Sequence, residues 1–373
     1  MTIYTVGRGD TLYGIARKFG VPVRDITSLN GLSNVDQLMV GQSLVIPAEV
    51  QPGIFVNGYA YPTISDITLA LTLPSLTFLS IFSYQVTSSG DLIPLNDSRV
   101  IRVAKDNNTL PMLVMTNIGA TGRFDSDLAH VILSNERIQE RLISNLIMTL
   151  RNKGYAGVNI DFEYVYPMDK ELYNAFLEKV VTRLQEEEFI VTTALAPKVR
   201  SDQVGTLYEA HDYATHGRLA DHVILMTYEW GYTYGPPMAV APINQVERVI
   251  AYAVTEIPSK KILMGIPNYG YDWTLPYEQG RPAKSISNTA AVALAAEKKV
   301  EIQFDPVAKA PYFYYKDENG ALHVVWFEDA RSVQAKLDFV KKYNLGGVSF
   351  WTVMNYFPQA FAVLNSNFQV EKA

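Results

Sequence analysis

Three polar side chains alternate with apolar residues in segment 154–165, which reads GYAGVNIDFEYV. Asn159, Asp161 and Glu163 stand two positions apart, and residues at i, i+2 and i+4 share one face of a β-strand. Neighbouring carboxylates repel and a buried one loses its hydration, so such a row is costly unless the protein uses it. Burial and a nearby like charge also raise a carboxyl pKa, which suits the group to general-acid catalysis. The alternative is a capping or salt-bridge pair at a strand end.

The composition predicts a globular protein with a large core, because 48% of the 373 residues are hydrophobic and 19% are charged. This length suits one large domain and one small domain. The net charge of −6 argues against nucleic acid as a partner, which would require a basic surface. The absence of cysteine excludes disulfides and thiol catalysis. His211 and His216 are poorly spaced for a shared metal on a helix, so we expect no metal and no other cofactor.

The sequence also predicts that no membrane is involved. The first residues, MTIYTVGRGDTL, lack the apolar core that follows a positive region in a secretory signal. The most apolar run, 69–82, is interrupted by Pro74 and contains several Thr and Ser residues, so it is too short and too broken to span a bilayer.

A small module is predicted at the start of the chain. Residues 3–6 form a candidate strand, and apolar residues recur at helical spacing over 12–19, followed by Gly20 as a stop signal. A second short helix is expected over 22–30, and a strand over 43–47 closes the module. We therefore predict a βααβ module over 1–48, a short semi-rigid linker over 49–52 between two prolines, and a large domain over 53–373.

The segments YTVGRGDTLYGIARKFGV and LMVGQSLVIP make this module resemble the LysM domain. The resemblance implies binding to glycans that contain N-acetylglucosamine, such as peptidoglycan or chitin. It places the glycan groove along segment 34–38 and along Gly9, Asp10, Thr11 and Leu12. The alternative is a small domain in which Gly-Asp-Thr is only a turn and a helix cap.

Eight apolar, β-rich runs alternate with helical patterns in the large domain, which predicts a (β/α)8 TIM barrel. Active sites of such barrels lie at the C-terminal ends of the strands, where Glu163 is expected. The gap of about 80 residues before the last strand is too long for one helix. We expect a small α+β insertion there, about 273–327, with a helix over 289–298 and a hairpin that turns at 318–320. The expected strands are 54–60, 78–84, 112–116, 157–161, 191–196, 223–228, 262–266 and 348–351.

Residues 53 to about 360 resemble family 18 glycoside hydrolases. The fourth-strand signature of that family is D-G-x-D-x-D-x-E, and this chain reads AGVNIDFE over 156–163. The last Asp and the Glu are retained, whereas Ala156 and Asn159 replace the first two acids. The segments MTYE at 226–229, GIPNYG at 265–270 and FW at 350–351 resemble further motifs of the family.

The resemblance implies hydrolysis in which Glu163 is the acid and the acetamido group of the substrate attacks. Asp161 would orient that group, Tyr228 would bond its oxygen, and Trp351 would lie under the sugar ring. Asn159 cannot exchange a proton but can form a hydrogen bond with Asp161. We therefore expect catalysis to be retained, with a changed acid limb in the pH–rate profile. The other substrate-binding candidates are Tyr59, Met226, Glu229, Trp230 and Tyr269. Trp273 and Trp326 are left open between core and groove, and we expect Glu186, Glu187 and Glu188 to be a solvated helix end.

The combination of modules most resembles the LysM-bearing spore cortex-lytic N-acetylglucosaminidases of endospore-forming bacteria. This resemblance implies cleavage of β-1,4 N-acetylglucosaminyl bonds in cortex fragments during germination. It also implies synthesis in the mother-cell cytoplasm and residence in the spore coat or at its cortex-facing surface. A chitinase and a non-catalytic glycan-binding protein are the alternatives, and the presence of Glu163 argues against the second.

Overall fold

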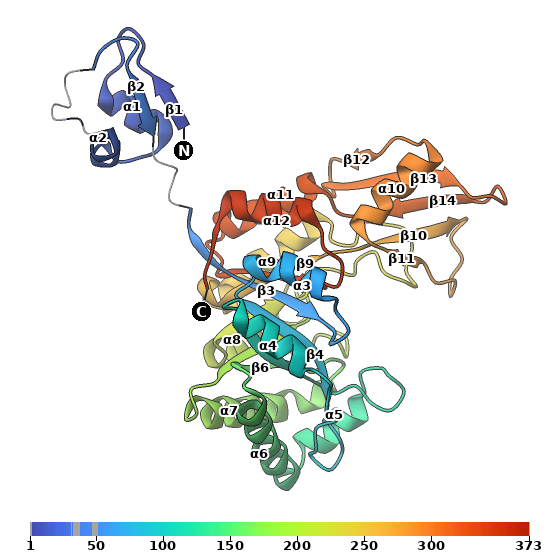
Figure 1. Cartoon of the computed structure of the whole chain (residues 1–373). Coiled ribbons are helices and arrows are strands. Elements are labelled where there is room, and N and C mark those ends of the chain that lie inside the picture. The colour runs from blue at the N-terminus through green and yellow to red at the C-terminus, as the bar shows by residue number, and fades with distance from the viewer. Residues whose placement is uncertain (1, 31, 33–37, 47–50, 373) are drawn as a thin grey trace. The chain divides into compact units, whose positions relative to one another are not determined.

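The computed structural model describes residues 2–30, 32, 38–46 and 51–372, and the chain divides into two compact units. The first unit is Met1–Pro52 and the second is Gly53–Ala373 (Figure 1). Each unit has its own hydrophobic core, and each is described by itself below.

The small unit has the predicted βααβ order. Strand β1 (Thr2–Thr5) pairs antiparallel with β2 (Ser43–Ile46), and helices α1 (Leu12–Phe19) and α2 (Val23–Asn30) lie between them in sequence. Helix α1 begins where the Thr11 side chain accepts a hydrogen bond from the Gly14 amide, and it ends at Gly20, whose φ of 68° is left-handed. The buried core consists of Val6, Leu12, Ile15, Ala16, Val21, Ile26, Leu44 and Ile46.

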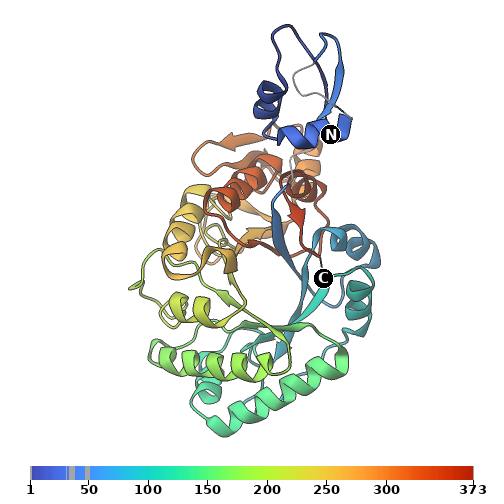
Figure 2. The same ribbon diagram turned by 90° about the vertical axis from the view of Figure 1, so that its left-hand side faces the viewer.

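The large unit is the predicted TIM barrel. Its parallel strands follow one another in chain order, and the last pairs with the first, which closes the barrel (Figure 2). Helices cover the outside of the strands, so the strands are almost entirely buried and read as apolar runs. The barrel strands are β3 (Gly53–Ala60), β4 (Phe78–Gln85), β5 (Leu110–Thr116), β6 (Gly157–Asp161), β7 (Ile190–Leu195), β8 (His222–Leu225), β9 (Ile262–Pro267) and β15 (Gly347–Trp351).

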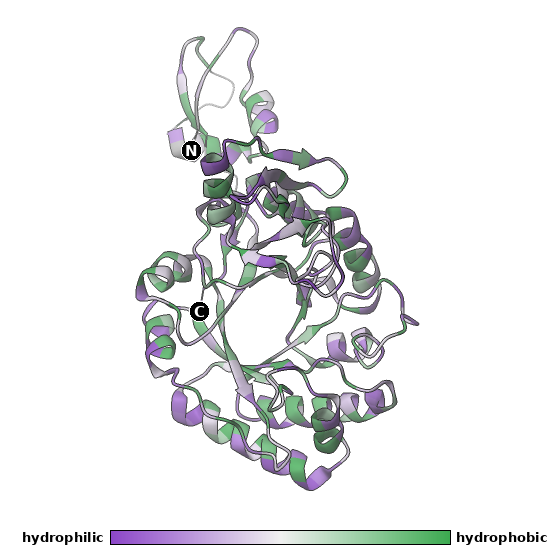
Figure 3. Ribbon diagram, turned by 90° about the vertical axis from the view of Figure 1, so that its right-hand side faces the viewer, coloured by the Kyte–Doolittle hydropathy of each residue, from purple (hydrophilic) through white to green (hydrophobic). Residues whose placement is uncertain are grey.

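The outer helices are amphipathic, and they carry both hydrophilic and hydrophobic residues in Figure 3. The longest, α6, is capped by the Asn135 side chain and ends at Gly154 in the left-handed conformation. The α-helices are α3 (Asp66–Thr72), α4 (Ser98–Asp106), α5 (Ser126–Leu133), α6 (Glu136–Lys153), α7 (Lys170–Gln185), α8 (Tyr213–Leu219), α9 (Ile243–Glu256), α11 (Ala330–Lys342) and α12 (Pro358–Asn367). Short 3-10 turns are η1 (Leu73–Ser75), η2 (Pro167–Asp169) and η3 (Ser259–Lys261). No helix among the described residues combines the length and the apolar character that crossing a bilayer requires.

Two features of the barrel differ from the sequence prediction. Strand β8 ends at Leu225 rather than at Tyr228, because the amides of Thr227 and Tyr228 bond back to the carbonyls of Leu225 and Met226 at 2.8 Å each. These tight turns lift Tyr228 out of the strand. The short strand β16 (Gln369–Val370), which pairs parallel with β3, was not predicted, because two residues carry no readable periodicity.

The expected α+β insertion lies between β9 and α11. It forms an antiparallel sheet in the order β11-β10-β14-β13-β12, with α10 (Asn288–Lys298) between β11 and β12 in the chain. The sheet begins at Gly270, three residues before the predicted boundary. The predicted hairpin is β13–β14, and its loop contains Gly320 with a φ of 81°. The strands are β10 (Gly270–Leu275), β11 (Lys284–Ile286), β12 (Gln303–Asp305), β13 (Ala310–Lys316) and β14 (Leu322–Trp326).

Candidate active site

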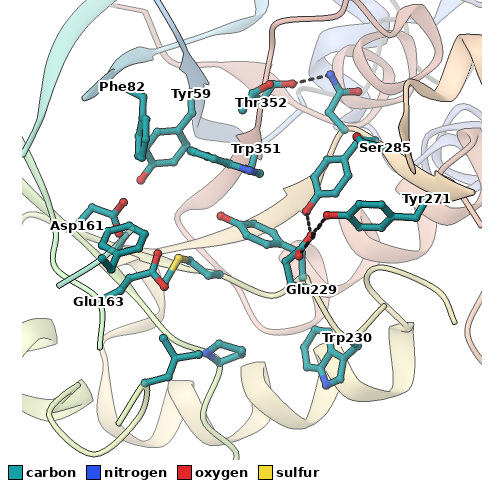
Figure 4. Close-up of a pocket in the computed structure, with 18 of the residues that line it drawn as sticks. Tyr59, Phe82, Asp161, Glu163, Glu229, Trp230, Tyr271, Ser285, Trp351 and Thr352 are labelled. Carbon is teal, nitrogen blue, oxygen red and sulfur yellow. Dashed lines mark hydrogen bonds between the residues drawn. The ribbon is translucent and has the colours of Figure 1, made fainter. Parts of the chain in front are cut away.

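A pocket of about 500 Å³ lies at the C-terminal ends of the barrel strands (Figure 4). Strand ends, the loops that follow them and the insertion all supply its walls, including Ser285 of β11. Parallel strands in a closed barrel deliver their last residues to one end, so residues far apart in sequence meet there. Of the predicted barrel residues, the pocket brings together Tyr59, Asp161, Glu163, Met226, Tyr228, Glu229, Trp230, Tyr269 and Trp351.

The two carboxyl groups of the fourth barrel strand face this pocket. Asp161 is the last residue of β6 and is 4% exposed, and its Oδ1 atom has no hydrogen-bond partner among the described residues. Burial raises the pKa of Asp161 to about 7. Burial raises the pKa of Glu163 well above its usual value, and the charges of Asp161 and Glu229 raise it further. Glu163 can therefore keep a proton at a pH at which an ordinary carboxyl group has lost it.

Asn159 does not line the pocket but lies beneath it, fully buried. Its Oδ1 atom accepts a hydrogen bond from the Tyr59 hydroxyl at 2.8 Å, and its Nδ2 atom donates to Thr192 Oγ1 at 2.9 Å. These partners differ from the expected one, since no hydrogen bond among the described residues joins Asn159 to Asp161. The amide is satisfied instead by Thr192 of the adjacent strand β7 and by Tyr59 of β3, which is not adjacent to β6 in the barrel.

Two residues that the sequence analysis missed hold the backbone around Glu163. Asn117 accepts a bond from the Glu163 amide at 2.9 Å and donates one to the Glu163 carbonyl at 2.8 Å. On the preceding residue, the Phe162 carbonyl accepts from His211 Nε2 at 2.9 Å, while His211 Nδ1 accepts from the Ala196 amide at 2.8 Å. Burial lowers the pKa of His211 to about 4, so the ring is neutral, as these two bonds require. Asn117 directly follows the apolar strand β5, and a polar residue at the end of a barrel strand was the sequence signal that could have identified it.

Tyr228 lies against a glycine that leaves room for it. A Cβ atom on Gly265 would lie 2.8 Å from the ring of Tyr228 and 2.4 Å from the Leu225 carbonyl oxygen. Burial, followed by the charges of Asp161 and Glu163, raises the pKa of Tyr228 well above its usual value. The hydroxyl therefore remains protonated and can donate a hydrogen bond to a substrate oxygen.

Two tyrosines hold Glu229, which lines the pocket on the side away from Asp161 and Glu163 (Figure 4). The Tyr269 hydroxyl donates to Glu229 Oε1, and the Tyr271 hydroxyl donates to the same atom at 3.0 Å (Figure 4). Burial raises the pKa of Glu229, and these two bonds oppose the rise. The backbone of Glu229 has a φ of 66° and that of Tyr164, beside Glu163, has a φ of 54°. Such conformations are costly for residues other than glycine, and they cluster at functional sites.

An aromatic cluster forms another wall of the pocket. Trp351 packs edge-on against Tyr59 and Phe82, with ring centroids 5.2 Å and 5.0 Å apart (Figure 4). Asn268 supports the loop after Trp351, because its Nδ2 atom donates to the carbonyls of Thr352 and Asn355 at 2.8 Å each. Phe82 and Asn268 line the pocket but were not among the predicted site residues.

The remaining candidates in the barrel unit are placed as follows. Trp273 is in the core, 2% exposed, and donates to the Gly235 carbonyl, whereas Trp326 is partly buried and stacks on Tyr312 with centroids 4.5 Å apart. Neither lines the pocket. The acidic run 186–188 follows α7, where Glu187 pairs with Arg151 and its two neighbours are exposed.

In the small unit, the predicted groove residues have structural partners. Asp10 Oδ2 accepts from the Gly7 amide at 2.6 Å and from the Tyr4 hydroxyl at 2.8 Å, and Thr11 caps α1. Leu12 is 2% exposed and belongs to the core of the small unit, so its side chain does not line a groove as expected. Gly9 is exposed with a φ of 84°. Of segment 34–38, only Leu38 belongs to the described residues.

The pocket can perform acid–base chemistry on a ring-shaped substrate. A carboxyl group with a raised pKa lies beside a second buried carboxyl group, protonated tyrosine hydroxyls provide donors, and an indole provides a flat apolar surface. In the described part of the chain, no group of three or more acidic or histidine side chains is placed to hold a metal ion.

Comparison with known proteins connects this geometry to a family. Residues 59–355 match the family described as "Glycosyl hydrolases family 18", and residues 4–47 match "LysM domain". The chain is 42% identical to a "Cortical fragment-lytic enzyme" of Bacillus anthracis, with 99% of each protein covered. It is 41% identical to the protein of the same name from Bacillus subtilis (strain 168), covering 100% of this chain and 99% of that protein.

A solved structure also resembles this chain over its whole length. The "spore cortex-lytic enzyme SleL" of Bacillus megaterium QM B1551 superposes with a TM-score of 0.87 at 41% sequence identity. The match covers 100% of this chain and 87% of that one. A chitinase from Chromobacterium violaceum, at 24% identity and a TM-score of 0.77, shares the fold.

Proposed function

Because the chain belongs to the family 18 glycosyl hydrolases, and is thus a glycosidase, we propose that it cleaves β-1,4 N-acetylglucosaminyl bonds in peptidoglycan. The proposed substrate is spore cortex fragments during germination. The main support for this proposal is sequence similarity: the chain is 41–42% identical, over nearly its whole length, to proteins named cortical fragment-lytic enzymes. The pocket supports it, since it supplies an acid with a raised pKa next to a second carboxyl group and an aromatic wall.

The proposed reaction proceeds with retention and uses the substrate's own acetamido group. Glu163 donates its proton to the glycosidic oxygen, and the C1–O bond breaks as the acetamido oxygen bonds to C1. Asp161 orients the acetamido N–H and stabilises the developing positive charge, while the Tyr228 hydroxyl bonds the acetamido oxygen. The Glu163 carboxylate then takes a proton from water, whose oxygen bonds to C1 as the bond from C1 to the acetamido oxygen breaks, which restores the acetamido group and releases the sugar. Trp351 lies beneath the ring throughout, and Asn159 supports the site from below.

The small unit is proposed to hold the enzyme on glycan that contains N-acetylglucosamine. Its likeness to the LysM domain supports this role. We propose residence in the spore coat or at its cortex-facing surface, after synthesis in the mother-cell cytoplasm, since the similar proteins are named for the spore cortex.

The test is release of reducing ends from three substrates: spore-cortex fragments, vegetative peptidoglycan and chitin oligomers, with products identified by mass. We expect release from cortex fragments with N-acetylglucosamine at the new reducing end. Glu163→Gln is expected to lose about a thousandfold or more in kcat, because the acid is removed. Glu186→Gln, at an exposed position after α7, is the matched control and retains activity.

Preferential release from chitin oligomers would instead identify a chitinase. Binding to these substrates without release of reducing ends from any of the three would identify a non-catalytic protein that binds N-acetylglucosamine glycans. Either outcome contradicts the proposed function.

A further inference from the structure

A second pocket adjoins the active-site pocket and shares three of its walls. Pro197, Tyr208 and Trp230 line both pockets, and the second has a volume of about 310 Å³. In Figure 4, Trp230 lies on the other side of the active site from Trp351. A glycan that places one sugar over Trp351 can therefore extend a neighbouring sugar past Trp230 into this second pocket, which we call the arginine pocket.

Two arginines from different elements line the arginine pocket. Arg200 belongs to the loop after β7, whereas Arg248 belongs to α9. The loop is braced, because Gln203 accepts from the Val199 amide at 2.9 Å. Arg200 pairs with the exposed carboxylate of Asp202 at 3.0 Å, and Arg248 donates to Gln245 at 3.1 Å. Both guanidinium groups are solvent-exposed and so are accessible to a ligand.

The two adjoining pockets have opposite charge. Asp161, Glu163 and Glu229 line the active-site pocket, which has no lysine or arginine among its described lining residues. The arginine pocket has two guanidinium groups and, among its described lining residues, no carboxylate. Arg200 already pairs with Asp202, but this exposed surface ion pair is weak, so an anion in the pocket can compete with it. An anionic group on a substrate would be repelled by the acids and attracted by the arginines.

We propose that the arginine pocket binds a carboxylate of the glycan, carried by a sugar next to the one in the active site. Guanidinium groups bind carboxylates with charge-assisted hydrogen bonds that are stronger than neutral ones. Peptidoglycan offers a free lactyl carboxylate on muramic acid residues that lack a stem peptide and peptide carboxylates on those that carry one, whereas chitin is neutral. The arginine pocket thereby selects peptidoglycan over chitin, an inference that rests on the proposed function because it concerns the same glycan.

The test measures binding by titration calorimetry in the full chain carrying Glu163→Gln, so that ligands are not consumed. The ligands are a peptidoglycan tetrasaccharide with free carboxylates, its methyl ester and neutral chitotetraose. We expect Arg200→Gln combined with Arg248→Gln to weaken binding of the acidic tetrasaccharide about tenfold, because charge-assisted bonds are lost. Binding of the ester and of chitotetraose is expected to change less than about twofold. Arg102→Gln, at an exposed position on α4, is the matched control.

Equal weakening of all three ligands would overturn the proposal, because it would show a structural effect on the shared wall. Unchanged binding of the acidic tetrasaccharide would overturn it as well. Two forms of the acidic tetrasaccharide separate the carboxylate sources: the form without stem peptides has free lactyl carboxylates, whereas the form with stem peptides has only peptide carboxylates. Discrimination with the first form alone assigns the lactyl group, and discrimination with the second alone assigns the peptide. Reducing-end release by the parent chain is scored separately, so failure of hydrolysis with retained discrimination counts against the proposed function alone.

Discussion

The carboxyl group of Asp161 lies at the end of β6 and is almost fully buried, and this burial raises its pKa to about 7. The unfolded chain keeps the ordinary value near 3.8. The folded state therefore becomes less stable as the pH rises through this interval, and above pH 7 the full cost is present. A site that needs neighbouring buried carboxyl groups costs stability, which is one physical reason why activity and stability compete.

Asp161→Asn should stabilise the protein while abolishing efficient turnover. We expect the free energy of unfolding at pH 8 to rise on the order of a few kcal/mol, since a buried charge is removed. The gain should shrink as the pH falls from 7 toward 3.8, because Asp161 is protonated in both states only below that value. Urea denaturation at pH 5 and pH 8 measures the difference, with Asp106→Asn on the exposed end of α4 as control. An Asp161→Asn variant no more stable than the parent at pH 8 would contradict this account.

Asn159→Asp places a third carboxyl group below the pocket, between Tyr59 and Thr192. We expect catalysis to be retained and the acid limb of the pH–rate profile to move to higher pH. A second buried acid near Asp161 raises the pKa at which that group ionises. The measurement compares kcat as a function of pH for the parent, Asn159→Asp and the exposed control Asn107→Asp. Superimposable profiles would show that position 159 does not tune the acids.

At the scale of elements, the acids of the fourth barrel strand lie at or just after the end of β6, and other elements fix the backbone there. Asn117 at the end of β5 and His211 in the loop before α8 hold the backbone of residues 162–163 from two sides. Backbone groups after a strand end have no ladder partners, so side chains of other elements must supply their hydrogen bonds. These hydrogen bonds fix the backbone that carries the Glu163 carboxyl group at the pocket.

Asn117→Ala removes both hydrogen bonds to the backbone of Glu163. We expect kcat to fall about tenfold to a hundredfold, because a misplaced acid loses its alignment with the leaving oxygen. The KM should change less than about threefold, since Asn117 does not line the pocket. Steady-state kinetics on cortex fragments measures both, with Asn107→Ala as control. A rise in KM at constant kcat would show that Asn117 contributes to substrate binding rather than to positioning Glu163.

His216 on α8 packs against Tyr173 on α7, with ring centroids 5.0 Å apart. Neither ring nitrogen has a hydrogen-bond partner within the described residues, and burial lowers its pKa to about 3. The unfolded value is 6.5, so its contribution to stability is present above pH 6.5 and is lost as the pH falls toward 3.

His216→Leu should therefore stabilise the protein against acid. We expect the gain in unfolding free energy to be on the order of 1–2 kcal/mol larger at pH 5 than at pH 8, because Leu cannot be protonated. Thermal unfolding at the two pH values measures this gain. An identical effect at both would mean that only packing had changed.

At the scale of the whole molecule, the two units have separate cores. Residues 53–373 alone are expected to hydrolyse soluble fragments with a kcat/KM within about twofold of the full chain, because the proposed site lies wholly within them. The same fragment should lose retention on insoluble peptidoglycan, measured by co-sedimentation. Equal sedimentation of both proteins would show that the small unit is not the anchor.

The sequence by itself determined the architecture and the central acids. Eight apolar runs predicted the barrel, the motifs predicted its family, and the alternation at 159–163 placed Asp161 and Glu163, because strand periodicity is a local property. Only the tertiary structure decided which residues complete the site. Asn117, His211, Phe82 and the arginine pocket come from segments distant in the chain, and hydrogen-bond partners and burial arise only when those segments meet. The partners of Asn159 and the burial of Leu12 differed from expectation for the same reason.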